Sequence, residues 1–375
     1  MNLSTSGAKQ LGAKPLLTTY TRNVLSFLAR SEISHDSVVL ALGSYAREDV
    51  RPGSDIDLLI LTKDKAQRKV YRRFSFEGIC YDYNDMSIAT CLLLQRKSPD
   101  WQHMLYYGKV LRDPTGVGQE IIRGLRSNFY SARSVRHRVR QFWEIVHAFA
   151  KASNEFSKQG HQWMGLLAMQ ESMVCSANIA IDISRGIIHS YYRHLHELER
   201  ALKSQGLTQL LNGYKVGLRL HKTTNGEAQV RLLHELASSL VSLLESHMNP
   251  SQQRLELAWN SLGYDRIEAV IQEHHWLVAN GEFSAATLVL RRYSLRMLAD
   301  CALLLLSRGY SDRRTSSIEN VVEAIARGLL PKEILTTFYQ VNLMPDVDYD
   351  NVLTSCNDFK GGVLESLRNQ KLLPT

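Results

Sequence analysis

The segment LGSYAREDVRPGSDIDLLIL, residues 42–61, contains two aspartates, Asp55 and Asp57, within an otherwise apolar run. Aspartate is depleted in β-strands, and alternation along a strand places residues i and i+2 on the same face. The two carboxylates would therefore point to the same place, where their charges repel unless a cation lies between them. The spacing predicts a strand that carries a metal site, with Asp55 and Asp57 as ligands.

The residues before this pair favour phosphate binding. The apolar run SVVLALGS, residues 37–44, predicts a strand that ends at Gly43 and Ser44, and SYARED is typical of a helix start. Glycine lets the backbone approach a ligand closely, and the N–H groups at a helix start attract phosphate. Ser44 adds a hydroxyl, and Arg47 adds a guanidinium that can reach the same anion. Phosphate donors beside metal ligands indicate phosphoryl or nucleotidyl transfer with magnesium.

This stretch resembles the signature of the nucleotidyltransferase superfamily with the polymerase-β-like fold. That signature is an apolar residue, Gly-Ser, about ten residues, and then Asp-apolar-Asp-apolar. The matching positions here are Leu42, Gly43, Ser44, Asp55, Ile56, Asp57 and Leu58. The chain is similar in particular to the kanamycin-nucleotidyltransferase-like and minimal nucleotidyltransferase groups, whose GSxAR and Ser-Asp-apolar-Asp patterns match Ser44, Ala46, Arg47 and Ser54. It departs from the pattern at Glu48, where many relatives have glycine.

The resemblance implies a third carboxylate on a neighbouring strand. GICYDYNDMS, residues 78–87, offers Asp82 and Asp85. Asp82 lies within an alternating aromatic strand and faces opposite to Tyr81 and Tyr83, whereas we expect Asp85 in the turn that follows. We therefore take Asp82 as the third ligand and leave Asp85 as the alternative.

The mechanism that the resemblance implies is an in-line displacement with two Mg²⁺ ions and a nucleoside triphosphate, which we take to be ATP. Asp55 and Asp57 would hold the ions, and Asp82 would complete the second and accept a proton from the acceptor hydroxyl. The Gly43 turn, Ser44 and Arg47 would bind the triphosphate, with Ser54 as a further part of the nucleotide-binding motif. In kanamycin-type relatives a glutamate from the helical region can act as the base, and Glu171 is the candidate by position.

The elements that must position these residues occupy the first part of the chain. A helix is expected at 16–30, and strands at 37–44, 55–62 and 74–85, with a charged connector at 63–73 between the last two. This pattern predicts a small mixed sheet with flanking helices, an α+β fold.

From about residue 118 the pattern changes to long helices. We expect a nucleotidyltransferase domain at 1–117 and helical bundles at 118–247 and 248–375. Their seam would lie at MNPSQQ, residues 248–253, because Asn-Pro followed by polar residues breaks a helix.

The composition restricts the compartment and the partner. Five cysteines without a C-x-x-C pair favour reduced thiols in the cytoplasm. The first fifteen residues lack the apolar core of a secretory signal, and the longest apolar run, residues 301–306, is too short to cross a membrane. A formal charge of +8 and a pI of about 9.2 favour a polyanionic partner, either a nucleoside triphosphate or a nucleic acid.

One stretch concentrates this charge. Residues 121–140 hold six arginines and no acid, with Phe129 and Tyr130 between them. The stretch is either a solvated helix face or a contact for polyphosphate or an RNA backbone, and the sequence leaves both open.

The resulting hypothesis is an enzyme that moves NMP, most simply AMP from ATP, to an acceptor hydroxyl with release of pyrophosphate. Aminoglycoside antibiotics are polycations and need an acidic pocket, which a charge of +8 does not favour. A nucleic acid end such as tRNA, or a protein side chain, fits the charge better. The alternative is a non-catalytic, regulatory or antitoxin-like nucleotide-binding module, although such a module has no need for paired carboxylates. The sequence does not determine the acceptor or the oligomeric state.

Overall fold

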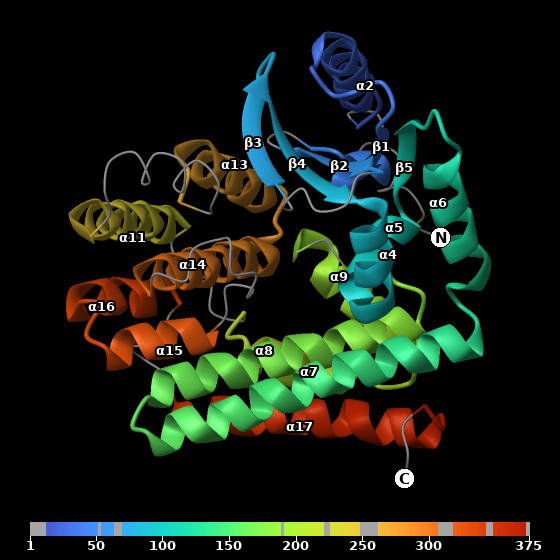
Figure 1. Ribbon diagram of the computed structural model, residues 1–375. Coiled ribbons are helices and arrows are strands. Elements are labelled where there is room, and N and C mark those ends of the chain that lie inside the picture. The colour runs from blue at the N-terminus through green and yellow to red at the C-terminus, as the bar shows by residue number, and fades with distance from the viewer. Residues whose placement is uncertain are drawn as a thin grey trace. The chain divides into compact units, whose positions relative to one another are not determined.

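The computed structural model describes residues 13–51, 54–63, 70–188, 191–220, 226–247, 262–306, 318–342 and 348–372. The chain divides into two compact units, Met1–Ser131 and Ala132–Thr375. The first contains a small mixed sheet with flanking helices, and the described part of the second is all helical (Figure 1). This confirms the predicted fold class.

The sheet of the first unit has five strands in the order β3-β4-β2-β1-β5. Their bounds are β1 Val38–Leu42, β2 Ile56–Thr62, β3 Val70–Phe76, β4 Ile79–Ser87 and β5 Lys109–Arg112. Strand β2 is antiparallel to β1 and parallel to β4, so the two strands that carry the candidate carboxylates lie side by side in the middle of the sheet.

The single strand expected at 74–85 is two strands, β3 and β4. They pair antiparallel from Phe76 opposite Ile79, and Glu77 and Gly78 between them have φ angles of 48° and 78°. Two consecutive positive φ angles are typical of the type I′ turn of a two-residue hairpin. The expected connector therefore ends earlier than predicted, and its residues 64–69 lie outside the described part of the chain.

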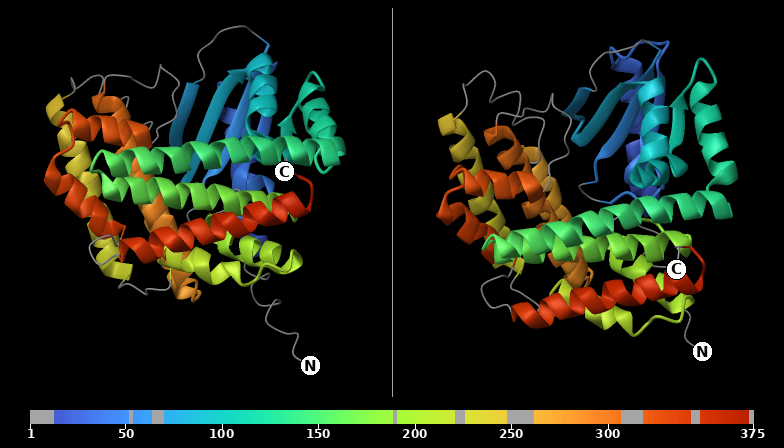
Figure 2. Two further views of the ribbon diagram at one scale, coloured as in Figure 1. Left: turned by 90° about the horizontal axis from the view of Figure 1, so that it is seen from below. Right: turned by 60° about the horizontal axis from the view of Figure 1, so that its bottom comes forward.

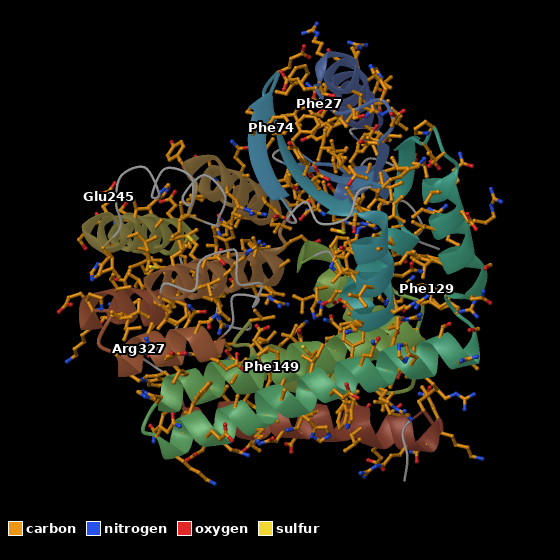
Figure 3. The ribbon with its side chains drawn as sticks, in the orientation of Figure 1. Phe27, Phe74, Phe129, Phe149, Glu245 and Arg327 are labelled. Carbon is orange, nitrogen blue, oxygen red and sulfur yellow. The ribbon has the colours of Figure 1, made fainter. Side chains whose placement is uncertain are left out.

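Helices cover both faces of the sheet. Helix α2, Ala13–Arg30, packs its buried face against one side of the strands, and Phe27 of α2 lies against Phe74 of β3 with ring centroids 5.2 Å apart (Figure 3). Helices α4 Ile88–Lys97, α5 Pro99–Tyr106 and α6 Val117–Asn128 cover the other side. Alternate residues of β1 and β2 face the helices on one side of the sheet and then those on the other. Both strands are therefore apolar along nearly all their length.

Caps in the sequence determine where two of these helices begin. Helix α4 begins after Ser87, whose hydroxyl accepts the backbone N–H of Thr90. Helix α5 begins after Ser98, whose hydroxyl accepts the backbone N–H of Trp101, and Pro99 occupies its first turn.

The described helices of the second unit are α7 Ala132–Lys158, α8 Gln162–Ile183, α9 Tyr191–Ser204, α10 Leu210–Gly217, α11 Gly226–His247, α13 Tyr264–Ala279, α14 Phe283–Leu305, α15 Ile318–Ala326, α16 Lys332–Val341 and α17 Tyr349–Asn369. Helices α7, α8 and α17 lie side by side (Figures 1 and 2). The buried cluster of this unit includes side chains from α7 through α17. The division into two bundles stays a prediction, since its seam at 248–253 lies outside the described residues.

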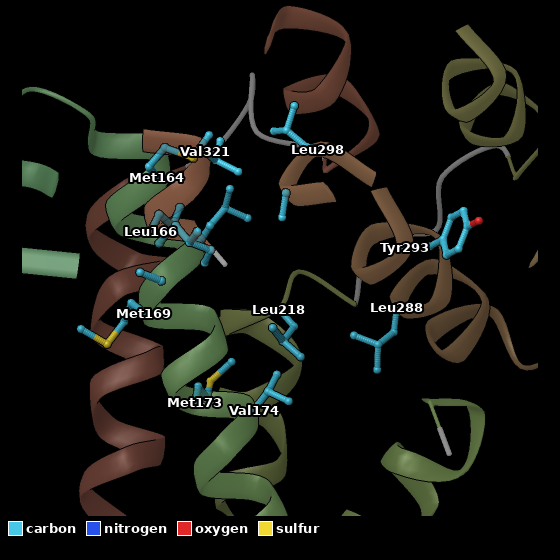
Figure 4. Packing of buried hydrophobic residues seen from close by; sticks show 14 of the residues in the cluster. Met164, Leu166, Met169, Met173, Val174, Leu218, Leu288, Tyr293, Leu298 and Val321 are labelled. Carbon is cyan, nitrogen blue, oxygen red and sulfur yellow. The ribbon is translucent and has the colours of Figure 1, made fainter. Parts of the chain in front are cut away.

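Helix α8 is the central helix of this unit. Its Met164, Leu166, Met169 and Met173 lie among buried side chains of neighbouring helices (Figure 4). By length and composition α8 could cross a membrane, but 83% of its most apolar window is buried within the structure. This is the pattern of a buried core helix.

Candidate active site

The three predicted carboxylates meet at one place on the sheet. Asp57 of β2 is directly opposite Asp82 of β4 in the parallel ladder, and Asp55 precedes the first residue of β2. One carboxylate oxygen from each of the three lies within 4.8 Å of the others. Asp82 is 2% exposed and the other two are half-buried, so this is a concentrated set of hard oxygen donors, the kind that Mg²⁺ prefers.

Asp85 does not belong to this cluster. It lies within β4, not in the turn after the strand, and its backbone pairs with Ile60 and Val70. Because Asp85 follows Asp82 by three residues, alternation directs the two side chains to opposite faces of the sheet. Of the two alternatives that the sequence left open, the structure brings Asp82 to Asp55 and Asp57.

The end of β1 lies directly against Asp57. Leu42 is opposite Asp57 in the ladder, and Gly43 follows with a φ of 64°. A Cβ atom at position 43 would lie 1.9 Å from Oδ2 of Asp57, so any side chain here would displace the Asp57 carboxylate. Glycine therefore suits this position both for its backbone conformation and because it leaves the Asp57 carboxylate in place.

The predicted helix start is a single turn, α3, Gly43–Ala46. Ser44 is half-buried within it, and its carbonyl accepts the backbone N–H of Asp49 at 3.0 Å. Arg47 follows the turn, and its Nε lies 3.4 Å from Oδ2 of Asp49, with both side chains less than a tenth exposed. The contacts of Ser44 and Arg47 with a triphosphate stay predictions.

The departure at Glu48 has a structural consequence. Glu48 has a φ of 61°, in the left-handed region that glycine adopts readily and other L-residues do not. This is the position at which many relatives of the resembled family have glycine. Glu48 retains the conformation while carrying a side chain, whose Oε1 lies 3.5 Å from Nζ of Lys109 at the surface.

Ser54 is bonded to Arg51 just before β2 begins. Its hydroxyl accepts the backbone N–H of Arg51 at 2.9 Å, and its own N–H donates to the carbonyl of Arg51 at 3.0 Å. A contact between Ser54 and the nucleotide stays a prediction; the bonds described here hold the chain immediately before Asp55.

Two residues of α2, Tyr20 and Asn23, contribute polar contacts that the sequence analysis missed. The Tyr20 hydroxyl donates to the carbonyl of Ser54 at 2.7 Å, and Oδ1 of Asn23 accepts the hydroxyl of Tyr81 at 2.5 Å. Burial, and secondarily the charge of Asp55, raises the pKa of Tyr20 to about 12. The sequence feature that could have indicated these contacts is Asn23, a polar residue on an otherwise apolar helix face.

Glu171 lies on α8 in the second unit. Its Oε2 accepts a hydrogen bond from Nη2 of Arg292 on α14 at 3.1 Å. A role for Glu171 as a catalytic base stays a prediction.

The basic stretch 121–140 is not uniformly available to solvent. Phe129 is buried in the core of the first unit, so it cannot stack on a base. Arg138 is buried in the second unit and forms two 2.9 Å hydrogen bonds with Asp182 of α8. The exposed arginines of the stretch are Arg123, Arg126, Arg133, Arg136 and Arg140.

The family model of the nucleotidyltransferase domain matches residues 22–97. No curated protein matches. Among solved structures the chain is similar to a nucleotidyltransferase-like protein from Exiguobacterium sibiricum 255-15, with 11% identity over 82% of this chain and 90% of that one. The TM-score of 0.33 does not establish a shared fold.

The matched residues 22–97 include Gly43, Ser44 and all three clustered carboxylates. The family signature and the cluster thus fall within one stretch of the first unit. This part of the chain is a nucleotidyltransferase domain and belongs to the nucleotidyltransferase superfamily.

Proposed function

We propose that the protein is a Mg²⁺-dependent nucleotidyltransferase that transfers NMP from a nucleoside triphosphate, in the first instance ATP, to an acceptor hydroxyl. The observation that supports this most directly is the meeting of Asp55, Asp57 and Asp82 within 4.8 Å, beside a glycine that leaves space for the Asp57 carboxylate. Three carboxylates so close together repel one another unless cations compensate their charge.

The donor set fits Mg²⁺, because all three side chains offer the oxygen ligands that this ion binds. When bound, Mg²⁺ supplies positive charge against the phosphates and the leaving pyrophosphate. Asp55 and Asp57 are the residues that we propose to hold the ions. Asp82 completes the set and accepts the proton of the acceptor hydroxyl as its oxygen bonds to the α-phosphorus and the bond to pyrophosphate breaks.

The triphosphate is proposed to bind at α3. The hydroxyl of Ser44 and the N–H groups at the start of this turn are the donors. Among the described residues Arg47 contacts Asp49 through Nε, and its Nη nitrogens are the groups that we propose for the phosphates.

The charge of the chain bears on the acceptor. A net charge of +8 and a pI near 9.2 favour a polyanion over a polycationic antibiotic. We therefore propose a nucleic acid end, such as that of a tRNA, as the first acceptor to test, and a protein hydroxyl as the second.

The test follows the transferred nucleotide. The protein is incubated with each α-³²P-labelled nucleoside triphosphate, Mg²⁺ and a cell extract, and the RNA, protein and small-molecule fractions are then separated. We expect label in the RNA or protein fraction, transfer abolished by Asp57→Asn, and transfer retained by Asp85→Asn, which changes the same kind of side chain on the opposite face of the sheet. Absence of label from every fraction, together with absence of pyrophosphate release, would contradict the proposal.

A further inference from the structure

The three carboxylates are not held equally by the sheet. Asp57 and Asp82 are direct partners in the ladder between β2 and β4, so regular backbone pairing sets their separation. That ladder begins at Ile56 opposite Tyr81, and Asp55 lies one residue before it. The position of Asp55 therefore depends on how Ser54, the residue before it, is held.

Tyr20 of α2 holds the backbone at Ser54. Its hydroxyl donates to the carbonyl of Ser54 at 2.7 Å and lies 3.2 Å from the carbonyl of Arg51. Tyr20 is 5% exposed, and a tyrosine hydroxyl is protonated at neutral pH and can donate. A buried donor of this kind fixes the backbone at Ser54, and Asp55 is the next residue.

Asn23, one turn further along α2, holds the neighbouring strand. Its Oδ1 accepts the hydroxyl of Tyr81 at 2.5 Å, and its Nδ2 donates to the carbonyl of Phe76 at 3.2 Å. Tyr81 immediately precedes Asp82 and is fully buried. One rigid helix is thus bonded to the residue before each of two clustered carboxylates.

We propose that Tyr20 and Asn23 are positioning residues that set the distance between Asp55 and Asp82 in the metal site. The inference rests on the proposed function, because it takes the three carboxylates as metal ligands. Tyr20 is the more important of the two, since Asp55 lacks the ladder pairing that already places Asp82.

Direct metal binding is the readout. Mn²⁺ alone is titrated into the full-length protein, and free Mn²⁺ is measured by electron paramagnetic resonance, without nucleotide. Loss of binding in Asp57→Asn shows that the signal reports this site. We expect Tyr20→Phe, which removes one oxygen atom, to weaken Mn²⁺ binding about 10-fold, the lower end for residues that orient metal ligands. Asn23→Leu should weaken it less.

Arg112→Met is the matched control for stability. Arg112 of β5 also bonds backbone carbonyls within the first unit, those of Ile33, Ser34 and Ser37. These lie before β1, at the opposite end of that strand from Gly43. Arg112→Met should therefore lower the unfolding temperature while leaving Mn²⁺ affinity unchanged.

The outcomes separate the two claims. If both Tyr20→Phe and Asn23→Leu bind Mn²⁺ with wild-type affinity, the inference is overturned and the proposed function remains in place. The same holds if Arg112→Met loses as much Mn²⁺ affinity as they do. If Tyr20→Phe fails to fold, the Mn²⁺ affinities of Asn23→Leu and Arg112→Met are compared instead, and they test the inference in the same way. If the wild-type protein binds no Mn²⁺ through Asp57, the proposed metal site and the inference fall together.

Discussion

At the scale of single residues, Gly43 is where backbone conformation and candidate chemistry meet. A methyl group there would overlap Oδ2 of Asp57 at 1.9 Å and also force a non-glycine residue to a φ of 64°. We expect Gly43→Ala to abolish metal binding and to lower the free energy of unfolding by about 1–2 kcal/mol through backbone strain alone. Mn²⁺ titration and urea unfolding measure the two effects.

Gly78 provides the matched control for this substitution. It has a φ of 78° in the turn before β4, but a Cβ added there meets nothing within 4 Å. Gly78→Ala should therefore show comparable destabilisation with normal metal affinity. Equal metal affinity in the two variants would show that the Asp57 carboxylate moves aside without consequence.

The residue scale also shows what a sequence can reveal about this site. Asp55 and Asp57 were predictable, because a two-residue period in an apolar strand is visible in the chain itself. The contact of Tyr20 with Ser54 was not, since it joins residues 34 positions apart through a backbone carbonyl that no residue type identifies. Asp85 was placed incorrectly because β4 continues two residues beyond it, to Ser87.

At the scale of elements, apolar periodicity predicted the helix and strands at 16–30, 37–44 and 55–62 closely, because each buries a regular face. The segment 74–85, predicted as one strand, is divided by a turn. The first residue of this turn, Glu77, is a non-glycine residue with a positive φ angle. Asn-Gly or Asp-Gly would have signalled this hairpin, whereas Glu-Gly does not. The apolar pattern therefore predicted which segments are buried more reliably than where one strand ends and the next begins.

A buried ion pair joins α7 to α8. Arg138 and Asp182 are both fully buried, with two hydrogen bonds of 2.9 Å. Removing one partner leaves the other charge buried without its ion pair. We therefore expect Asp182→Ala to lower the free energy of unfolding by about 3–5 kcal/mol. The double variant Arg138→Met with Asp182→Leu should recover most of this loss.

Urea unfolding of the single and double variants measures this effect. The surface pair between Lys151 and Glu155, also on α7, is the control, and Glu155→Gln should change stability little because exposed pairs are screened by solvent. A double variant no more stable than Asp182→Ala would contradict the expectation.

At the scale of the whole molecule, the charge of +8 is the property most open to test. Arg133, Arg136 and Arg140 are exposed on α7, while Arg138 between them is buried. If this face contacts RNA, replacing the three exposed arginines with glutamine should weaken binding. The log–log dependence of affinity on salt should flatten by about one for each lost phosphate contact with a duplex, and by less with a single strand.

The same triple variant should bind ATP as the wild type does, because Ser44 and the carboxylates are unchanged. Glutamine at the exposed Lys151, Lys158 and Lys203 removes equal charge elsewhere in the second unit and is the control. An unchanged salt slope in the arginine variant would identify the face as merely solvated. Weaker ATP binding with an unchanged slope would instead indicate a triphosphate clamp.

The sheet order also has a consequence for how the protein is made. The residues proposed for the metal and triphosphate site, with Tyr20 and Asn23, all precede the first residue of α7, as does every described strand through β5 at Lys109–Arg112. Domains generally fold as units, beginning with the N-terminal one during synthesis. The nascent chain can therefore close its sheet on the ribosome and bring its carboxylates together before the helical unit has been fully translated.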